Sequence, residues 1–318
     1  MTKFDPYRKK TFTSYWNHFS TQPKRTQITS LFLKNVKKKL KAFLGYQIKI
    51  QSYKKINTNN EFFSSYQKNE HILQYRNKLL CAEVIKYIKD FEINCSKQNI
   101  VKYVEQYCKI FSESPIKEMD SGFAFNEGLF LYCLIKIIKP SMVIESGIMR
   151  GFTTYLIDAA TDKNCLINCY DISFEKLTYK SPKGFYFEHD IHKNPPNFEN
   201  HKVLAFWDDH TSQLDRLEFS IENKIKFNFF DDDLGFLNFH SDGWPPIPSI
   251  TMLYELKQNL IKENSVKWVS RNREGEIKLD GIKNNNAIEQ VNFHKLFPNL
   301  FPITGYKSHS ECSFVVLK

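Results

Sequence analysis

Acidic residues and one histidine stand directly behind two apolar segments of the chain. The segments 202–207 and 225–230 are followed by Asp208, Asp209, His210, Asp231, Asp232 and Asp233. We expect both segments to be parallel strands, whose carboxyl ends meet at one edge of a sheet. Carboxylates gathered there repel one another, and a divalent cation would neutralise them. Carboxylate oxygens suit Mg²⁺, Mn²⁺ or Ca²⁺, so Asp208, Asp231 and Asp232 are candidate metal ligands.

A cation at this edge would also activate a hydroxyl group of a substrate. It would lower the pKa of the bound hydroxyl, and His210 or Asp209 would accept the proton as general base. The alternative is that some of these acids cap the following helices, where the helix dipole favours carboxylates. Asp208 and Asp209 precede a predicted helix, so capping accounts for part of the pattern.

A second group of candidate residues lies between Pro140 and Asp171. The apolar run 142–144 fits a buried parallel strand. The candidate ligand-binding residues behind it are Glu145, Gly147, Gly151, Thr153 and Asp171. Glycines let the backbone approach a ligand closely. An acid after the second strand, 165–170, suits a ribose because a carboxylate can accept both hydroxyl hydrogens.

The glycine spacing separates two cofactors. A dinucleotide site favours Gly-x-Gly-x-x-Gly, with the pyrophosphate at the helix N-terminus. Here Met149 stands where a middle glycine would be, and Glu145 would repel the pyrophosphate. The cationic amino and sulfonium groups of S-adenosylmethionine fit an acidic strand end better. The alternative is a glycine-containing turn of some other α/β protein.

Alternating strands and helices predict the sheet that positions these residues. Besides 142–144 and 165–170, strands are expected at 184–190, 202–210, 225–233, 266–271 and 313–318. Asp190, at the end of 184–190, would contact an adenine amino group, or else be a solvated carboxylate. The pattern predicts an α/β fold with a doubly wound, mostly parallel seven-stranded sheet and an N-terminal helical extension.

Helical periodicity predicts the remaining elements. Helices are expected at 69–93, 97–112 and 126–138, the last capped by Asn126. Their apolar stripes indicate core packing or an oligomer interface. The segments 113–125 and 234–248 are expected to be loops over the pocket, the second an active-site lid.

Charge is distributed unevenly along the chain, whose formal net charge is +10. Residues 1–60 contain 14 lysine and arginine residues and one acid, whereas the remainder is slightly acidic. This distribution argues against a nucleic acid as partner. The helix predicted at 28–44 is amphipathic and lysine-rich, which indicates either an anionic membrane surface as partner or packing on the body of the protein.

The chain shows no sign of secretion or of a membrane span. It begins without the apolar stretch of a signal peptide, and no apolar run reaches the roughly 18 residues of a membrane span. Seven scattered cysteines without a Cys-x-x-Cys pair indicate reduced thiols. We expect a cytoplasmic protein, with peripheral membrane attachment through 28–44 as an option.

Two motifs resemble those of a known family. The pattern Glu-x-Gly-x-x-x-Gly-x-Thr, with an acid 20 residues past the second glycine, resembles motifs I and II of class I S-adenosylmethionine-dependent methyltransferases. FWDDHTSQLDRL and FFDDD are similar to segments of catechol-O-methyltransferase-like enzymes and of the macrocin O-methyltransferase and cephalosporin hydroxylase-like group. The likeness covers roughly 125–235. Thr211, Ser212 and Gln213 stand where the catechol enzymes have a lysine base, so catechol is not the expected substrate.

The resemblance implies a role for each matching residue. Gly147, Gly151, Thr153 and Asp171 would line the cofactor. Asp208 or Asp209, together with Asp231 and Asp232, would hold a metal, and His210 would be the base.

We therefore expect a methyltransferase-like domain at 116–318, a helical segment at 69–115 and a basic extension at 1–68. The expected activity is S-adenosylmethionine-dependent O-methylation of a hydroxyl on a small molecule or glycan, assisted by Mg²⁺ or Mn²⁺. The alternatives are a non-catalytic module that binds S-adenosylmethionine and a nicotinamide-dependent oxidoreductase. A nucleic-acid methyltransferase is disfavoured because the Asn/Asp-Pro-Pro-Tyr/Phe motif is missing.

Overall fold

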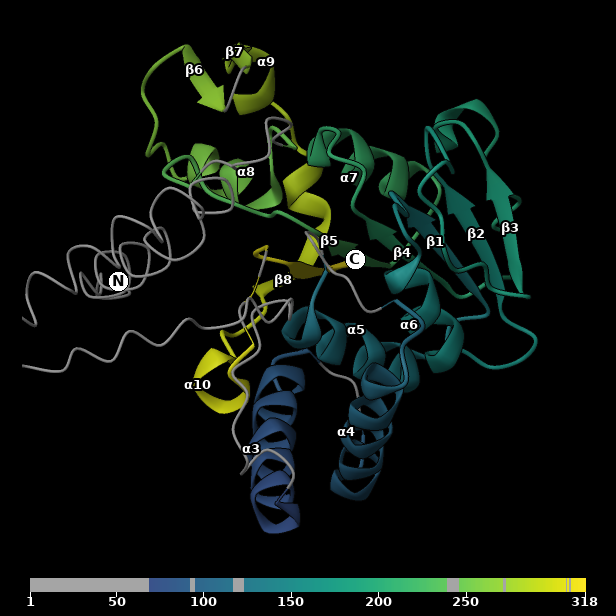
Figure 1. Cartoon of the computed structure of the whole chain (residues 1–318). Helices are drawn as coiled ribbons and strands as arrows, with labels where there is room; N and C mark the ends of the chain where they lie inside the picture. Colours follow the sequence, from purple (N-terminus) through teal and green to yellow (C-terminus); the bar gives the residue numbers. More distant parts are fainter. Residues whose placement is uncertain are drawn as a thin grey trace, which may run out of the picture. The chain divides into compact units, whose positions relative to one another are not determined.

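A computed structural model describes residues 69–91, 95–116, 123–238, 246–270, 273–306, 308 and 310–318 (Figure 1). These residues belong to one compact unit that spans 57–318. The predicted helix 28–44 lies outside the described residues, as do 117–122 and 239–245 of the two predicted loops. In the part that is described, no helix has the length and apolar character needed to cross a membrane.

The core of the fold is a seven-stranded sheet with the order β3-β2-β1-β4-β5-β9-β8. Its strands are β1 Met142–Ser146, β2 Leu166–Tyr170, β3 Gly184–Phe187, β4 Val203–Trp207, β5 Phe227–Phe230, β8 Val291–Leu296 and β9 Ser313–Leu317. The first five are mutually parallel, and β9 runs antiparallel to both β5 and β8. This confirms the predicted fold, a mostly parallel sheet of the Rossmann-like methyltransferase type.

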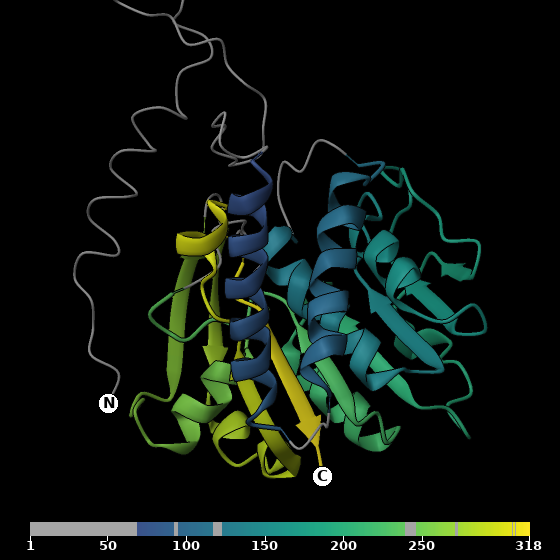
Figure 2. The same cartoon turned by 90° about the horizontal axis from the view of Figure 1, so that it is seen from below.

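Helices cover both faces of the sheet because the central strands are apolar on both sides. One face packs against α3 Glu70–Ile88, α4 Lys97–Ser112, α5 Phe125–Ile138 and α6 Phe152–Ala160. Figure 2 shows α3 and α4 lying across this face. The other face packs against α7 Gln213–Glu222 and α8 Ile250–Lys257. Side chains alternate between the two faces along each strand, so Val143 joins the first core and Ile144 the second.

One predicted strand lies outside the sheet. The predicted strand 266–271 overlaps β6 Ser265–Ser270, which pairs with β7 Arg273–Lys278 in a separate two-stranded hairpin. The seventh strand of the main sheet is instead β8, with the sequence Val-Asn-Phe-His-Lys-Leu. Its polar residues suit an edge strand, where charged and polar side chains discourage pairing with another chain. Because these polar residues interrupt the apolar ones, the sequence pattern does not predict this strand.

The start of α5 also differs from the prediction. The N-cap is Ala124 rather than Asn126, and Glu127 Oε2 accepts a hydrogen bond from the Ala124 amide at 3.3 Å. Asn126 lies inside the helix, where its Nδ2 donates to the Tyr306 carbonyl at 2.9 Å. The remaining short elements are η2 Ile191–Lys193, α9 Asp280–Lys283, η3 Ala287–Gln290 and α10 Phe301–Thr304.

Candidate active site

The turn between β1 and α6 brings the backbone close to its neighbours. Gly147 and Gly151 both have φ of +86°, in the left-handed region that favours glycine. A Cβ on Gly147 would lie 2.0 Å from the Asp208 carbonyl oxygen, and one on Gly151 would lie 2.4 Å from the Tyr179 carbonyl oxygen. Both positions therefore require glycine, and the turn lies directly against the end of β4.

Asp171 holds this turn in place. Its Oδ2 accepts hydrogen bonds from the amides of Ile148 at 2.8 Å and Met149 at 3.1 Å, and its Oδ1 accepts one from the Ser173 amide at 3.1 Å. Met149 has φ of +51°, so the non-glycine residue adopts the conformation that a middle glycine would favour. Asp171 stands at the end of β2 as expected. Each carboxylate oxygen has two lone pairs, so Oδ1 keeps capacity for a ligand hydroxyl.

Glu145 lies beneath the turn rather than in an open pocket. It is fully buried on the α6 face and paired in register with Cys169, whose thiol donates to Glu145 Oε2 at 3.7 Å. Burial raises the pKa of Glu145 to about 8, so the carboxyl is mostly protonated at pH 7. This differs from the expected ligand role, because strand alternation turns the side chain into the core. Thr153 is buried in the first turn of α6.

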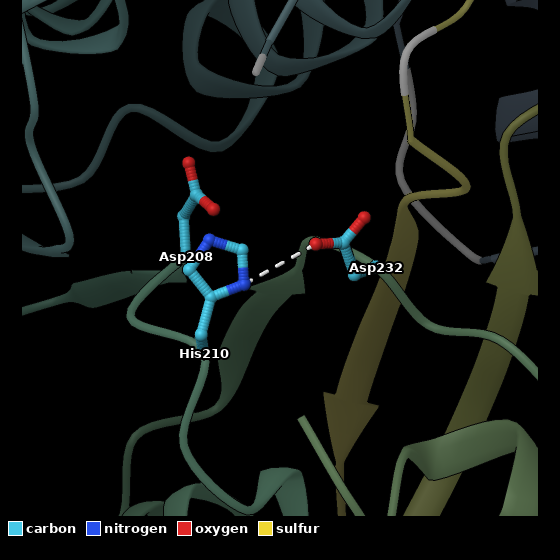
Figure 3. A group of neighbouring side chains, drawn as sticks. All are labelled: Asp208, His210 and Asp232. Atoms are coloured by element: carbon cyan, nitrogen blue, oxygen red, sulfur yellow. Dashed lines mark ion pairs between the residues drawn. The ribbon is translucent and has the colours of Figure 1, made fainter. Parts of the chain in front are cut away.

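The ends of β4 and β5 bring three predicted residues together (Figure 3). Asp208, His210 and Asp232 each offer one side-chain atom that could bind a metal ion, and these atoms all lie within 4.8 Å of one another. His210 Nδ1 is 3.5 Å from Asp232 Oδ2. His210 and Asp232 both have φ of +54°, a conformation that costs a non-glycine residue roughly 1–2 kcal/mol. Such strain is found preferentially at functional sites. Two carboxylates and an imidazole form a donor set suited to a divalent cation.

Asp231 extends this group towards the core. Burial raises the pKa of Asp208 well above its ordinary range, and the neighbouring charge and hydrogen bond of Asp231 raise it further. Asp231 Oδ1 also accepts hydrogen bonds from Ser310 Oγ at 2.5 Å and Cys312 Sγ at 2.6 Å. A proton or a cation between the Asp208 and Asp231 carboxyl groups would relieve this repulsion.

Asp209 points away from this group. Its Oδ2 accepts hydrogen bonds from Ser146 Oγ at 2.6 Å and Arg216 Nε at 2.8 Å, while its Oδ1 accepts one from Thr211 Oγ1 at 2.7 Å. With both oxygens engaged, Asp209 is a structural anchor, and Asp208 is the member of the tandem pair that faces His210. The N-cap of α7 is Ser212, so neither aspartate caps that helix.

Arg216 was not among the predicted site residues, although it lies in the segment FWDDHTSQLDRL that carries the resemblance. Its side chain is 2% exposed, stacks 5.4 Å from the Trp207 ring centroid and pairs with both Asp209 and Asp190. Asp190 is thereby directed to Arg216, and it also accepts the His192 amide at 2.9 Å. This arrangement leaves the expected adenine contact of Asp190 without support.

Glu127 is a second residue that the sequence analysis missed. Burial raises its pKa to about 7, and the charge of Asp231 contributes to the rise. Nothing in the helical pattern of 126–138 distinguishes it from an ordinary surface acid. A small cavity is lined by residues that include Asp208, His210, Asp232 and Pro246. Pro246 comes from the segment predicted as a lid.

Comparisons with known proteins add only distant similarities. No protein-family model and no curated protein matches the chain. The O-methyltransferase from Bacillus cereus in complex with SAH shares 14% identity over 76% of this chain and 100% of that chain, with a TM-score of 0.38. TomG from Streptomyces achromogenes, an O-methyltransferase in complex with SAM, shares 8% over 74% and 96%, with a TM-score of 0.39. Podospora anserina methyltransferase PaMTH1, bound to SAH, shares 11% over 81% and 100%, with a TM-score of 0.36. At these values the similarity carries no argument about activity, which must come from the geometry of the site.

Proposed function

We propose that this chain is an S-adenosylmethionine-dependent O-methyltransferase that uses a divalent cation to methylate a hydroxyl of a small molecule or glycan. The observation that carries the proposal is the contact between Gly147 and Asp208. This contact places the glycine turn, which Asp171 holds from the end of β2, directly beside the side chains of Asp208, His210 and Asp232. A methyl donor and an activated hydroxyl would thus meet at one edge of the sheet.

The donor set fits a cation. The charge of Asp231 raises the pKa of Asp208, and a positive charge between two ionised carboxylates would offset their repulsion. S-adenosylmethionine would supply the methyl group, and Mg²⁺ or Mn²⁺ would supply the charge that lowers the pKa of the acceptor hydroxyl.

The chain's own residues would bind the methyl donor and the cation and remove the proton of the acceptor. The turn at Gly147 and Gly151 would receive the donor, with Asp171 Oδ1 beside its ribose. Asp208, Asp231 and Asp232 would hold the cation. His210 would take the proton of the acceptor hydroxyl, and Asp232 would stabilise the resulting imidazolium through its contact with Nδ1. The deprotonated acceptor oxygen would then be the group that receives the methyl supplied by bound S-adenosylmethionine.

His210 has a second candidate role, because its ring lies within the cation-binding group. The two roles make different predictions for His210→Ala. A ligand role predicts weaker Mg²⁺ binding, whereas a base role predicts intact Mg²⁺ binding and a loss of turnover of about 10²-fold or more. Calorimetry with Mg²⁺ and a single-turnover assay on the same variant separate them.

The site proposal is tested by titrating S-adenosylmethionine and NAD⁺ into the full chain by calorimetry, with and without Mg²⁺. NAD⁺ is included because a buried, protonated Glu145 would not repel a pyrophosphate. We expect micromolar binding of S-adenosylmethionine and none of NAD⁺. Binding of NAD⁺ alone would favour the oxidoreductase, and binding of neither would refute the cofactor site.

The metal proposal is tested by Asp232→Asn, with Asp280→Asn as matched control. Asp280 is exposed in the first turn of α9, on a different element from the acid cluster. We expect Asp232→Asn to abolish Mg²⁺ binding and metal-dependent turnover while S-adenosylmethionine still binds, and Asp280→Asn to change neither. Unchanged activity of Asp232→Asn in metal-free buffer would refute the metal role. Binding of S-adenosylmethionine with no turnover of any hydroxyl acceptor would favour the non-catalytic module.

The partners and location of the protein follow as proposals from the sequence. A small molecule or glycan is the proposed acceptor, and the slightly acidic body argues against nucleic acid. We propose a cytoplasmic protein, attached to an anionic membrane surface where its basic segment 28–44 binds one.

A further inference from the structure

A groove lies where α4, the C-terminal end of α5 and the C-terminal end of α6 meet. It encloses about 520 Å³, including space open to solvent, and its lining contains Lys102, Lys136, Lys139, Tyr103, Gln106 and Asp162. Figure 1 shows α4, α5 and α6 packed on the same side of the sheet. The lining is rich in charged and hydrogen-bonding groups, whereas a site for an apolar ligand is lined mostly by hydrophobic side chains.

The charge of the groove is positive. Three lysines and one aspartate line it, which leaves a net charge of +2. Burial lowers the pKa of Lys136, and the nearby Lys183, Lys102 and Lys139 lower it further, against the opposing effect of Asp162. The ammonium groups therefore repel one another, and an anion between them would relieve that repulsion.

Another lysine close to the groove, Lys183, already has partners. Lys183 Nζ pairs with Asp158 Oδ1 at 2.9 Å and donates to Thr161 Oγ1 at 2.8 Å. Among the described residues, no carboxylate lies within ion-pair distance of Lys102, Lys136 or Lys139. The Lys136 ammonium lies 5.7 Å from the Tyr132 ring centroid, which is a cation–π contact rather than an ion pair.

The groove is separate from the candidate active site. Lys139 caps α5 three residues before β1 begins, so it lies at the amino end of that strand. The turn at Gly147 and the acids at 208–210 follow the carboxyl ends of their strands. A ligand in the groove would therefore not be the methyl acceptor.

We infer that this groove binds a phosphoryl group, as a phosphate monoester or diphosphate, between Lys102, Lys136 and Lys139. A phosphate monoester carries a charge of about −1.5 to −2 at pH 7, which matches the charge of the lining. Lysine binds phosphate as a point charge and does not need a fixed bidentate geometry. Tyr103 and Gln106 supply further hydrogen-bonding groups at the wall.

The experiment uses the full chain and inorganic pyrophosphate, titrated by calorimetry at constant ionic strength. Lys136→Gln removes one of the three lysine charges of the lining, and Lys267→Gln, at an exposed lysine of β6, is the matched control. We expect Lys136→Gln to weaken pyrophosphate binding about tenfold or more, because a hydrogen bond to a charged group is involved. Lys267→Gln should bind as the unaltered chain does. Equal weakening in both variants, or equal heat from chloride at the same ionic strength, would overturn the inference.

Vesicles distinguish a lipid headgroup from a soluble phosphate. Phosphatidylcholine vesicles with and without phosphatidate are sedimented with the unaltered chain and with Lys136→Gln. A lipid headgroup is supported if Lys136→Gln sediments less with the phosphatidate vesicles than the unaltered chain does. A soluble ligand is supported if Lys136→Gln weakens only the binding of pyrophosphate. S-adenosylmethionine is titrated into the same variants and should bind unchanged, so failure of the groove and failure of the proposed function give different results.

Discussion

Arg216→Met tests whether the buried guanidinium anchors the ends of β4 and β1. Methionine keeps much of the apolar stem that packs near Trp207 but removes the charge that pairs with Asp209 and Asp190. The Asp209 side chain is only 15% exposed, so it would become a nearly buried carboxylate without its cation.

The expected loss follows from the exposure of the two carboxylates. Removing one partner of a buried ion pair costs about 3–5 kcal/mol. Asp190 is 43% exposed, so water replaces most of its interaction and its share is small. Ser146 and Thr211 continue to donate to Asp209, which favours the lower end of the range, about 3 kcal/mol. The midpoint of thermal unfolding should then fall by about 6–12 °C.

Urea denaturation followed by circular dichroism measures the free energy of unfolding. The control is Lys257→Met, which breaks the ion pair with Glu289. Both partners of that pair are about half exposed, so the control should lose no more than about 1 kcal/mol. The double variant Arg216→Met, Asp209→Asn should recover part of the loss, because the uncompensated charge is then absent. Equal losses for Arg216→Met and Lys257→Met would refute the anchoring role.

Two further predictions concern the turn and the acid beneath it. Gly147→Ala should lower the free energy of unfolding by more than about 4 kcal/mol, since its Cβ would overlap the Asp208 carbonyl in a left-handed conformation; a urea midpoint close to that of the unaltered chain would contradict this. Glu145→Gln should change the pH dependence of stability. The pKa of Glu145 is about 8 in the folded chain and roughly 4.3 when unfolded, so the folded state binds the proton more tightly and stability falls as pH rises between these values. Urea midpoints from pH 4 to 9 should fall less steeply for the variant, and parallel profiles would show that Glu145 does not titrate in this range.

The fold was predictable because its central strands are largely apolar and buried. Every residue of β1, β4 and β9 is buried, so the runs stand out in the sequence. The edge strand β8 does not stand out in this way, because its side chains are only partly buried and its residues are both polar and apolar. The strand predicted at 266–271 is the converse case. The strand β6 does form there, but it pairs with β7 in a hairpin, and apolar patterning alone does not distinguish such a hairpin from the main sheet.

The residue types of the candidate site could be predicted, but the directions in which their side chains point could not. Tandem acids at 208 and 209 leave open which one faces the histidine, and the left-handed backbone at His210 and the partner Arg216 decide it. Likewise, Glu145 stands two residues before a glycine, where an acid near a ligand is expected. Whether it points to the ligand or to the core depends on which face of β1 meets α6, and that is set by packing across the whole sheet.

The position of β9 has a consequence for how the chain reaches its fold. This strand lies between β5 and β8, although more than 80 residues separate it from β5 in sequence. Until residues 313–317 are in place, β5 presents an unpaired edge with the sequence Phe-Asn-Phe-Phe, and β8 lacks its partner strand in the sheet. Contacts at such long separation form late and slowly. A nascent or partly unfolded chain would therefore expose an aromatic strand edge, the kind of surface that pairs with other chains and that chaperones bind.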